Sequence, residues 1–401
     1  MSEKLLLESQ FKKLSKSEKI NAFYQAATEN GLPVAIWSLP KSNEFYLLIS
    51  FSKSALKGSI ELENEKPGFL FSPFSNEDGS QNYFLNADLL YHTQTDVLSI
   101  NPAIAIEKQQ MVDELLDKIN NGNFGKLEKD TSPIAFQKSK DYISIVNNGI
   151  NKIKAGQYDK LVLSRNKRIQ LSDNFDPIEK LWKLRSSYDS AFCYLLSTKE
   201  FGNWMAATPE TLITLNADTF ETVSLAGTSR LEPGESLNNV SWTQKEIEEQ
   251  AMVSRYIINS FKKIRLREFK ETGPRTIKAG NLAHLKTTFS VKYQEINFPE
   301  LGTVMLKLLH PTSAVCGMPL EAARNFINTF EGFDRSLFAG YLGPVNIADS
   351  TNIFVNLRTM RFNQSEAVLY AGAGITEDSV AEKELIETEL KMKTLLNVIE
   401  S

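Results

Sequence analysis

Residues 371–391, AGAGITEDSVAEKELIETELK, constrain the fold of this chain more than any other segment. They follow an alternating apolar run at residues 367–370 and continue into residues that favour a helix. The pattern therefore predicts a strand, a small-residue turn and then a helix. Gly372 and Gly374 carry no Cβ, so a ligand could approach the backbone closely at this turn.

Three charged residues of the same segment share one face of the predicted helix. Glu384, Glu387 and Lys391 stand at positions i, i+3 and i+7. One interpretation is a divalent metal site that holds an anionic ligand beside the glycine turn. The other is a solvated helix face with an ion pair between Glu387 and Lys391, and the helical spacing by itself favours this second interpretation.

The composition is that of an ordinary globular protein. The chain has 401 residues, which is enough for two domains or one large one. Apolar residues make up 42% and charged residues 23%, both close to the globular average. The formal net charge of −4 and the lack of a basic stripe argue against nucleic acid as a partner.

The cysteines and histidines bear on the compartment and on the kind of metal. Cys193 and Cys316 lie far apart without metal-site spacing, which indicates buried thiols in a reducing compartment. No apolar run has the length of a signal peptide core or a membrane span, so a cytoplasmic protein is expected. With only His92, His284 and His310 available, a metal would be a hard cation such as Mg²⁺, bound through oxygen.

Strand-like runs joined by short turns indicate antiparallel pairing, and helices interleave with them without strict alternation. The runs include residues 34–39 and a single long strand at 353–362. The expected class is α+β, with a large antiparallel sheet and packed helices. A polar stretch predicts a boundary near residue 125, between a scaffold portion (1–125) and the remainder (126–401), or both parts fold around one core.

Lys160 lies in the apolar strand DKLVLSR, on the same strand face as Val162 and Ser164. Such a lysine is either a charged group that protects an edge strand or a group directed into a cavity, and the edge interpretation is the commoner one. In a cavity, burial could make the amine neutral and therefore a usable general base.

Three other segments carry polar residues with two interpretations each. Glu210 follows a proline turn and is either a surface carboxylate or an acid kept protonated by apolar surroundings. Gly227 and Thr228 end a strand and could present backbone N–H groups to a carboxylate. Glu249 lies on a helix where glutamates are usually solvated, so its spacing alone does not make it a metal ligand.

Taken together, these segments resemble the chorismate-utilising enzymes, and among them the isochorismate synthases. The matching strings occur in the family's order: DKLVLSR (159–165), ATPETL (207–212), LAGTSR (225–230), KEIEE (245–249), HLKT (284–287), HPTSAVCGMP (310–319), FAGYLGPV (338–345), NLR (356–358), YAGAGITEDS (370–379) and EKELIETELK (382–391). The first third of the chain carries no such motif, as in the variable N-terminal portion of that family.

The resemblance implies an α+β fold around a deep Mg²⁺-dependent site that isomerises chorismate to isochorismate. Water adds at C2 while the C4 hydroxyl departs. Lys160 matches the lysine that activates the water, and Glu210 matches the acid that protonates the leaving hydroxyl. These two groups need environments that push their pKa values apart.

The resemblance also assigns residues to the metal and to the substrate. The implied Mg²⁺ ligands are Glu249, Glu384 and Glu387. The implied substrate contacts are the side chains of Arg358 and Lys391 and the backbone groups of Gly227, Thr228, Ala373 and Gly374.

The chain departs from the family pattern at positions beside these residues. Glu384 is followed by Leu385 instead of tryptophan, Glu246 replaces an aspartate, and Gln250 replaces a histidine. Ser313 stands where proline is common. None of these changes removes a proposed catalytic group, so they bear on the surroundings of the site and not on the reaction class.

Other members of the family supply the alternatives. Salicylate synthases share the lysine and also eliminate pyruvate, and aminodeoxychorismate synthases take ammonia from a glutaminase. A non-catalytic chorismate-binding protein is a fourth reading, which the retained acid–base pair argues against. We expect no obligatory glutaminase partner. The sequence leaves open both the oligomeric state and whether the product feeds menaquinone or a siderophore.

Overall fold

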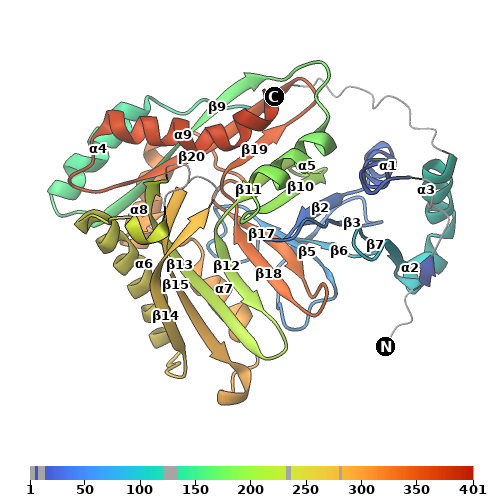
Figure 1. The fold of residues 1–401 in the computed structure, drawn as a ribbon, viewed down its shortest axis with the longest axis horizontal. Helices are drawn as coiled ribbons and strands as arrows, with labels where there is room; N and C mark the ends of the chain where they lie inside the picture. Colours follow the sequence, from blue (N-terminus) through green and yellow to red (C-terminus); the bar gives the residue numbers. More distant parts are fainter. Residues whose placement is uncertain (1–4, 8–13, 122–132, 232–235, 280–281, 401) are drawn as a thin grey trace.

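The computed structural model describes residues 5–7, 14–121, 133–231, 236–279 and 282–400. Two large antiparallel sheets and the helices around them form the described part of the chain (Figure 1). This architecture confirms the predicted α+β class. No helix in these ranges is long and apolar enough to cross a membrane.

The first sheet has eleven strands. In spatial order they are β1 (Leu5–Leu7), β8 (Val97–Ile100), β7 (Leu89–His92), β3 (Tyr46–Ile49), β2 (Val34–Ser38), β10 (Phe192–Thr198), β11 (Gly202–Thr208), β19 (Thr359–Phe362), β20 (Glu366–Ile375), β9 (Lys160–Gln170) and β16 (Gly317–Met318).

The second sheet has nine strands. In spatial order they are β14 (Lys270–Ala279), β15 (Leu282–Lys292), β13 (Thr219–Arg230), β12 (Thr211–Leu215), β18 (Thr351–Val355), β17 (Tyr341–Val345), β5 (Gly68–Ser72), β6 (Asn82–Asn86) and β4 (Leu56–Gly58).

The helices of the described ranges are α1 (Lys16–Glu29), α2 (Pro102–Glu107), α3 (Gln109–Asn121), α4 (Tyr142–Lys154), α5 (Pro177–Ser187), α6 (Gln244–Lys263), α7 (Leu301–Leu309), α8 (Leu320–Phe330), α9 (Ala381–Ile399) and the short 3₁₀ turns η1 (Leu237–Asn239) and η2 (Tyr293–Glu295). Local chemistry explains where α1 begins. The Ser15 hydroxyl accepts from the Glu18 N–H, and Glu18 accepts from the Ser15 N–H at 2.7 Å, which completes a capping box.

Successive side chains along a strand face two different hydrophobic cores, because side chains alternate between the two faces of a sheet. On β2, Ala35 and Trp37 face the core between the sheets, whereas Val34 and Ile36 face the core beneath α1, α3, α5 and α9. Phe192 of β10 stacks on Phe354 of β18 with ring centroids 4.1 Å apart, so aromatic packing joins the two sheets.

Strands that precede residue 122 contribute to both sheets. β2 pairs with β10 in the first sheet, and β5 pairs with β17 in the second. The predicted boundary at residue 125 lies outside the described residues, so the division into a scaffold portion and a catalytic portion stays a prediction.

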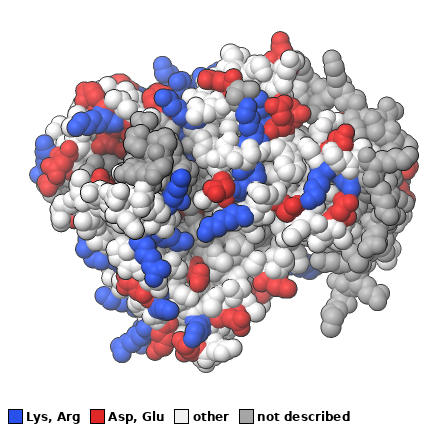
Figure 2. Space-filling view, viewed as in Figure 1, with Lys and Arg blue, Asp and Glu red and all other residues white. Residues whose placement is uncertain are grey.

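On the face in Figure 2, acidic and basic side chains are interspersed.

Two predictions about the strands are wrong. Residues 353–362 do not form one strand, because the chain passes from β18 in one sheet to β19 in the other. Arg358, at this crossover, has a left-handed backbone with φ of 49°. Residues 371–374 do not form a turn but belong to β20, where Gly372 pairs with Ser164 of β9 and Gly374 with Val162.

Candidate active site

A cavity of about 200 Å³ lies between the two sheets. It brings together eight of the eleven residues that the family resemblance assigned to metal, substrate or catalysis. These eight are Lys160, Glu210, Gly227, Glu249, Arg358, Gly374, Glu387 and Lys391.

Of the other three predicted residues, Ala373 and Glu384 are not among the residues that line the cavity. Ala373 is fully buried, and its side chain lies on the face of β20 opposite to the face that borders the cavity at Gly372 and Gly374. Glu384 is 4% exposed and is not part of the cavity lining. Thr228 follows Gly227 in β13, and its side chain lies outside the described part of the chain.

Strand β9 supplies one wall, because Lys160, Val162 and Ser164 alternate along it and all line the cavity. Lys160 is buried at 5% exposure. The edge-strand interpretation of Lys160 is wrong, since Met318 of β16 pairs with it. A Cβ on Gly374 would lie 2.9 Å from Lys160 Cε and 3.6 Å from Glu249 Oε1, so a glycine here lets both side chains approach the strand.

Glu210 enters the cavity from the short connection between β11 and β12. Its carbonyl accepts a hydrogen bond from the Val355 N–H at 2.9 Å, which fixes the backbone beside the crossover. Burial raises the pKa of Glu210 to about 7, although Lys160 and Lys391 act in the opposite direction. A large fraction of this carboxyl therefore holds its proton near neutral pH.

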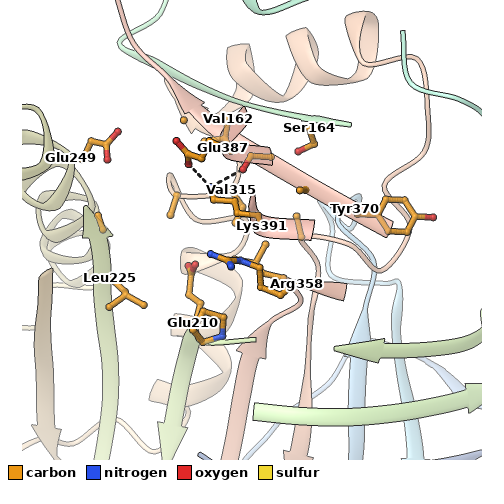
Figure 3. A pocket seen from close by; sticks show the side chains of 18 of the residues that line it. Val162, Ser164, Glu210, Leu225, Glu249, Val315, Arg358, Tyr370, Glu387 and Lys391 are labelled. Atoms are coloured by element: carbon orange, nitrogen blue, oxygen red, sulfur yellow. Dashed lines mark hydrogen bonds and ion pairs between the residues drawn. The ribbon is translucent and has the colours of Figure 1, made fainter. Parts of the chain in front are cut away.

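Helix α9 carries an ion pair into the cavity wall. Lys391 Nζ lies 2.6 Å from Glu387 Oε1 and donates a hydrogen bond to the Gly372 carbonyl at 2.8 Å (Figure 3). Arg358 is tied to the same helix, since its Nη1 donates to Thr394 Oγ1 at 3.1 Å. The ion pair that the helical spacing favoured is therefore present, and it faces the cavity.

Carboxylates from two helices line the cavity, and both belong to the residues that the family resemblance assigned to a metal. Glu249 comes from α6 and Glu387 from α9, and both extend into the same space in Figure 3. Within the ranges described above, no three His, Cys, Asp or Glu side chains are grouped closely enough to hold a metal. Mg²⁺ typically takes one or two carboxylates and completes its shell with water and substrate oxygens, so this donor pair fits that ion.

Sequence reasoning missed several residues of the cavity wall. Glu246, which was assigned no role although it shares a helical face with Glu249, lies one turn before Glu249 and lines the cavity with it. His284, within the HLKT string, places Nδ1 2.8 Å from the Gly227 carbonyl. Burial lowers the pKa of His284 to about 4, so the ring is neutral and donates to that carbonyl.

A buried ion pair beside β9 was also missed, and its Arg335 lines the cavity. Arg335 Nε donates to Glu331 Oε2 at 2.9 Å, and both side chains are almost fully buried. Glu331 accepts from the Ser164 N–H at 2.7 Å, and Arg335 donates to the Val162 carbonyl at 2.8 Å. The pair therefore fixes the backbone of two residues that line the cavity.

Comparison with known proteins agrees with this geometry. Isochorismate synthase EntC of Escherichia coli (strain K12) is 30% identical over 247 residues, which cover 60% of this chain and 62% of EntC. The match thus spans about three fifths of the length of that relative.

Two solved structures share the fold. MenF, the menaquinone-specific isochorismate synthase of Escherichia coli, superimposes with a TM-score of 0.72 at 18% identity, covering 92% of this chain and 88% of MenF. Anthranilate synthase component I of Streptococcus pneumoniae TIGR4 gives 0.65 at 20% identity and 90% coverage of both chains. The family model described as chorismate binding enzyme matches residues 10–400. The chain belongs to the chorismate binding enzyme family.

Proposed function

We propose that this protein is an isochorismate synthase, an isomerase that converts chorismate to isochorismate. The observation that carries the proposal is the pairing of Lys160 and Glu210 in one cavity, with the pKa of Glu210 raised to about 7. The isomerisation needs a base for water and an acid for the departing hydroxyl, and these residues supply one of each.

The proton transfers balance across the cavity. Lys160 accepts a proton from the water that forms the new C2–O bond. Glu210 gives its proton to the C4 hydroxyl, which departs as water when the C4–O bond breaks. The enzyme then exchanges one proton at each residue with solvent before the next turnover.

We propose Mg²⁺ as the cofactor, held by Glu249 and Glu387. Glu384, which is buried one turn before Glu387 on α9, is the third carboxylate that the family resemblance assigns to the ion. When bound, Mg²⁺ would compensate the negative charge of the substrate's ring carboxylate beside these glutamates.

Arg358 and Lys391 are the proposed carboxylate-binding residues of the same site. Both line the cavity, and both are fixed by contacts with α9 or β20. The planar guanidinium of Arg358 suits a carboxylate because it can donate two parallel hydrogen bonds. Because water is the proposed nucleophile, we expect activity without a glutaminase partner.

The direct test is incubation of the purified protein with chorismate, with and without Mg²⁺, followed by chromatography and mass spectrometry. A Mg²⁺-dependent product of unchanged mass is expected. Salicylate and pyruvate would instead identify a salicylate synthase, and turnover only with ammonia or a glutaminase would identify an aminating enzyme. No turnover under any of these conditions would favour a chorismate-binding protein without catalytic activity.

A further inference from the structure

A second, much smaller cavity lies behind Glu210. Its volume is about 10 Å³, which is room for about one water molecule. Its walls come from β12, β13, α6 and the loop after α7, and Glu210 lines both this space and the large cavity. The proposed acid therefore borders both the cavity proposed for the substrate and this small space.

Thr312 lines this small cavity from the loop after α7. The residue is 7% exposed, and its Oγ1 is buried without a hydrogen bond of ordinary geometry to any described residue. The Val315 and Cys316 N–H groups both bind the Thr312 carbonyl, at 3.1 and 3.0 Å, so the loop is fixed at this point. A buried hydroxyl without a partner is costly, which favours a partner inside the cavity.

Two other hydroxyls around the cavity already have acceptors. Thr222 Oγ1 donates to the Leu212 carbonyl at 2.7 Å, and the Tyr256 hydroxyl donates to the Leu308 carbonyl at 2.8 Å. Hydrogen bonding by the Thr312 side chain lowers the pKa of the Glu210 carboxyl, yet the direct contact between the two side chains lacks ordinary hydrogen-bond geometry. One water molecule could join the two side chains, because the cavity that both of them line has space for it.

We propose that Thr312 is a positioning residue for Glu210 and acts through one water molecule held in the small cavity. The Thr312 hydroxyl donates to the water, and the water donates to a carboxylate oxygen of Glu210. No proton is transferred in this arrangement. It orients the carboxyl and stabilises the negative charge that remains after Glu210 has protonated the leaving hydroxyl, so it rests on the acid role proposed above.

Other ionisable groups line the two cavities that Glu210 borders, and a substitution that tests Thr312 has to leave these groups unchanged. Those that line the large cavity with Glu210 are Lys160, Glu246, Glu249, His284, Arg335, Arg358, Tyr370, Glu387 and Lys391, and Tyr256 lines the small cavity. Replacing Thr312 by valine changes none of them and nearly preserves the side-chain volume. A changed titration of Glu210 in that variant would therefore report on the hydroxyl.

The test compares Thr312→Val with Thr312→Ser. Infrared titration of the protonated carboxyl band, assigned with Glu210→Gln, follows Glu210 in the protein without substrate. Valine is expected to raise the pKa of Glu210 by about one, since a hydrogen bond to a charged group is lost. With chorismate, kcat should fall about tenfold at unchanged KM, and the alkaline limb of the pH profile should move to higher pH. Thr312→Ser should keep the pKa of Glu210, kcat and the pH profile close to those of the wild type.

Ser313→Ala is the matched control. Ser313 Oγ is also buried and without a hydrogen bond among the described residues, but Ser313 lines neither cavity. This variant should leave the titration of Glu210 unchanged. An unchanged titration in Thr312→Val, or a serine variant that behaves like valine, would overturn the inference. If the wild-type protein does not convert chorismate, the proposed function fails, while the infrared titration still decides the role of Thr312.

Discussion

The ammonium of Lys391 lies 2.6 Å from the carboxylate of Glu387, one turn apart on α9 and at the wall of the cavity. A proposed substrate-binding cation and a proposed metal ligand thus form a direct ion pair with each other. The same lysine binds the Gly372 carbonyl, so the pair also ties α9 to β20. Substitutions at this pair are therefore expected to affect both the proposed Mg²⁺ binding and the proposed substrate binding.

Glu387→Gln is expected to raise the Mg²⁺ concentration needed for half-maximal activity at least about tenfold, because an amide binds Mg²⁺ less well than a carboxylate. Titration calorimetry with Mg²⁺ alone should show the same weakening. Glu389→Gln is the control, since Glu389 pairs with Arg165 and Lys167 and does not line the cavity. An unchanged Mg²⁺ dependence in Glu387→Gln would remove Glu387 from the metal site.

Lys160→Ala is expected to lower kcat by at least about 100-fold, because the base that accepts the proton of water is lost. Circular dichroism and Mg²⁺ binding should match the wild type. Lys167→Ala removes a lysine from the exposed part of the same strand and should leave kcat unchanged. Near wild-type turnover by Lys160→Ala would contradict the base assignment.

Gly374→Ala tests the close approach of Lys160 to β20. The new Cβ would lie 2.9 Å from Lys160 Cε and 3.3 Å from its Nζ, so the lysine has to move away from its position. We expect a fall in kcat of about tenfold or more, with a folded protein by circular dichroism. Gly58→Ala is a suitable control, because no heavy atom lies within 4 Å of its added Cβ. Equal activity of the two variants would show that the position of Lys160 tolerates the displacement.

Glu210 should also make the stability of the protein depend on pH. Its pKa rises from 4.5, the value of an unperturbed glutamate, to about 7 in the folded protein, so the folded state binds this proton more tightly than the unfolded chain. The resulting stabilisation is fully present below pH 4.5 and is lost as the pH rises through 7. The glutamine side chain of Glu210→Gln stays neutral at every pH, so this variant does not lose that stabilisation as the pH rises.

Urea unfolding at pH 5 and pH 8 would measure this effect. Relative to the wild type, Glu210→Gln is expected to have the larger free energy of unfolding at pH 8 and to lose most of that advantage at pH 5. Free energies that change in parallel between the two pH values would show that the carboxyl of Glu210 titrates alike in the folded and unfolded chain.

Local patterns in the sequence determined several elements of the fold, among them β9 and α9, which carry the site. The capping box at Ser15 and Glu18 places the start of α1, and alternation on β9 places Lys160 on one face with Ser164. Helical spacing puts Glu387 and Lys391 together on α9. Each of these features depends on residues only a few positions apart, so a periodic pattern or a cap motif is enough to specify it.

Tertiary structure decided the features that depend on residues far apart in the chain. The crossover at Arg358 exists because β18 and β19 pair into different sheets, although their sequence is a continuous strand-like run. Gly372 and Gly374 lie in a strand because β9, some 200 residues earlier, pairs with them. The small cavity behind Glu210 forms where Thr312 meets β12 and α6. Such contacts depend on how the sheets and helices pack after the chain has closed long loops, and local hydrophobic patterns do not encode that packing.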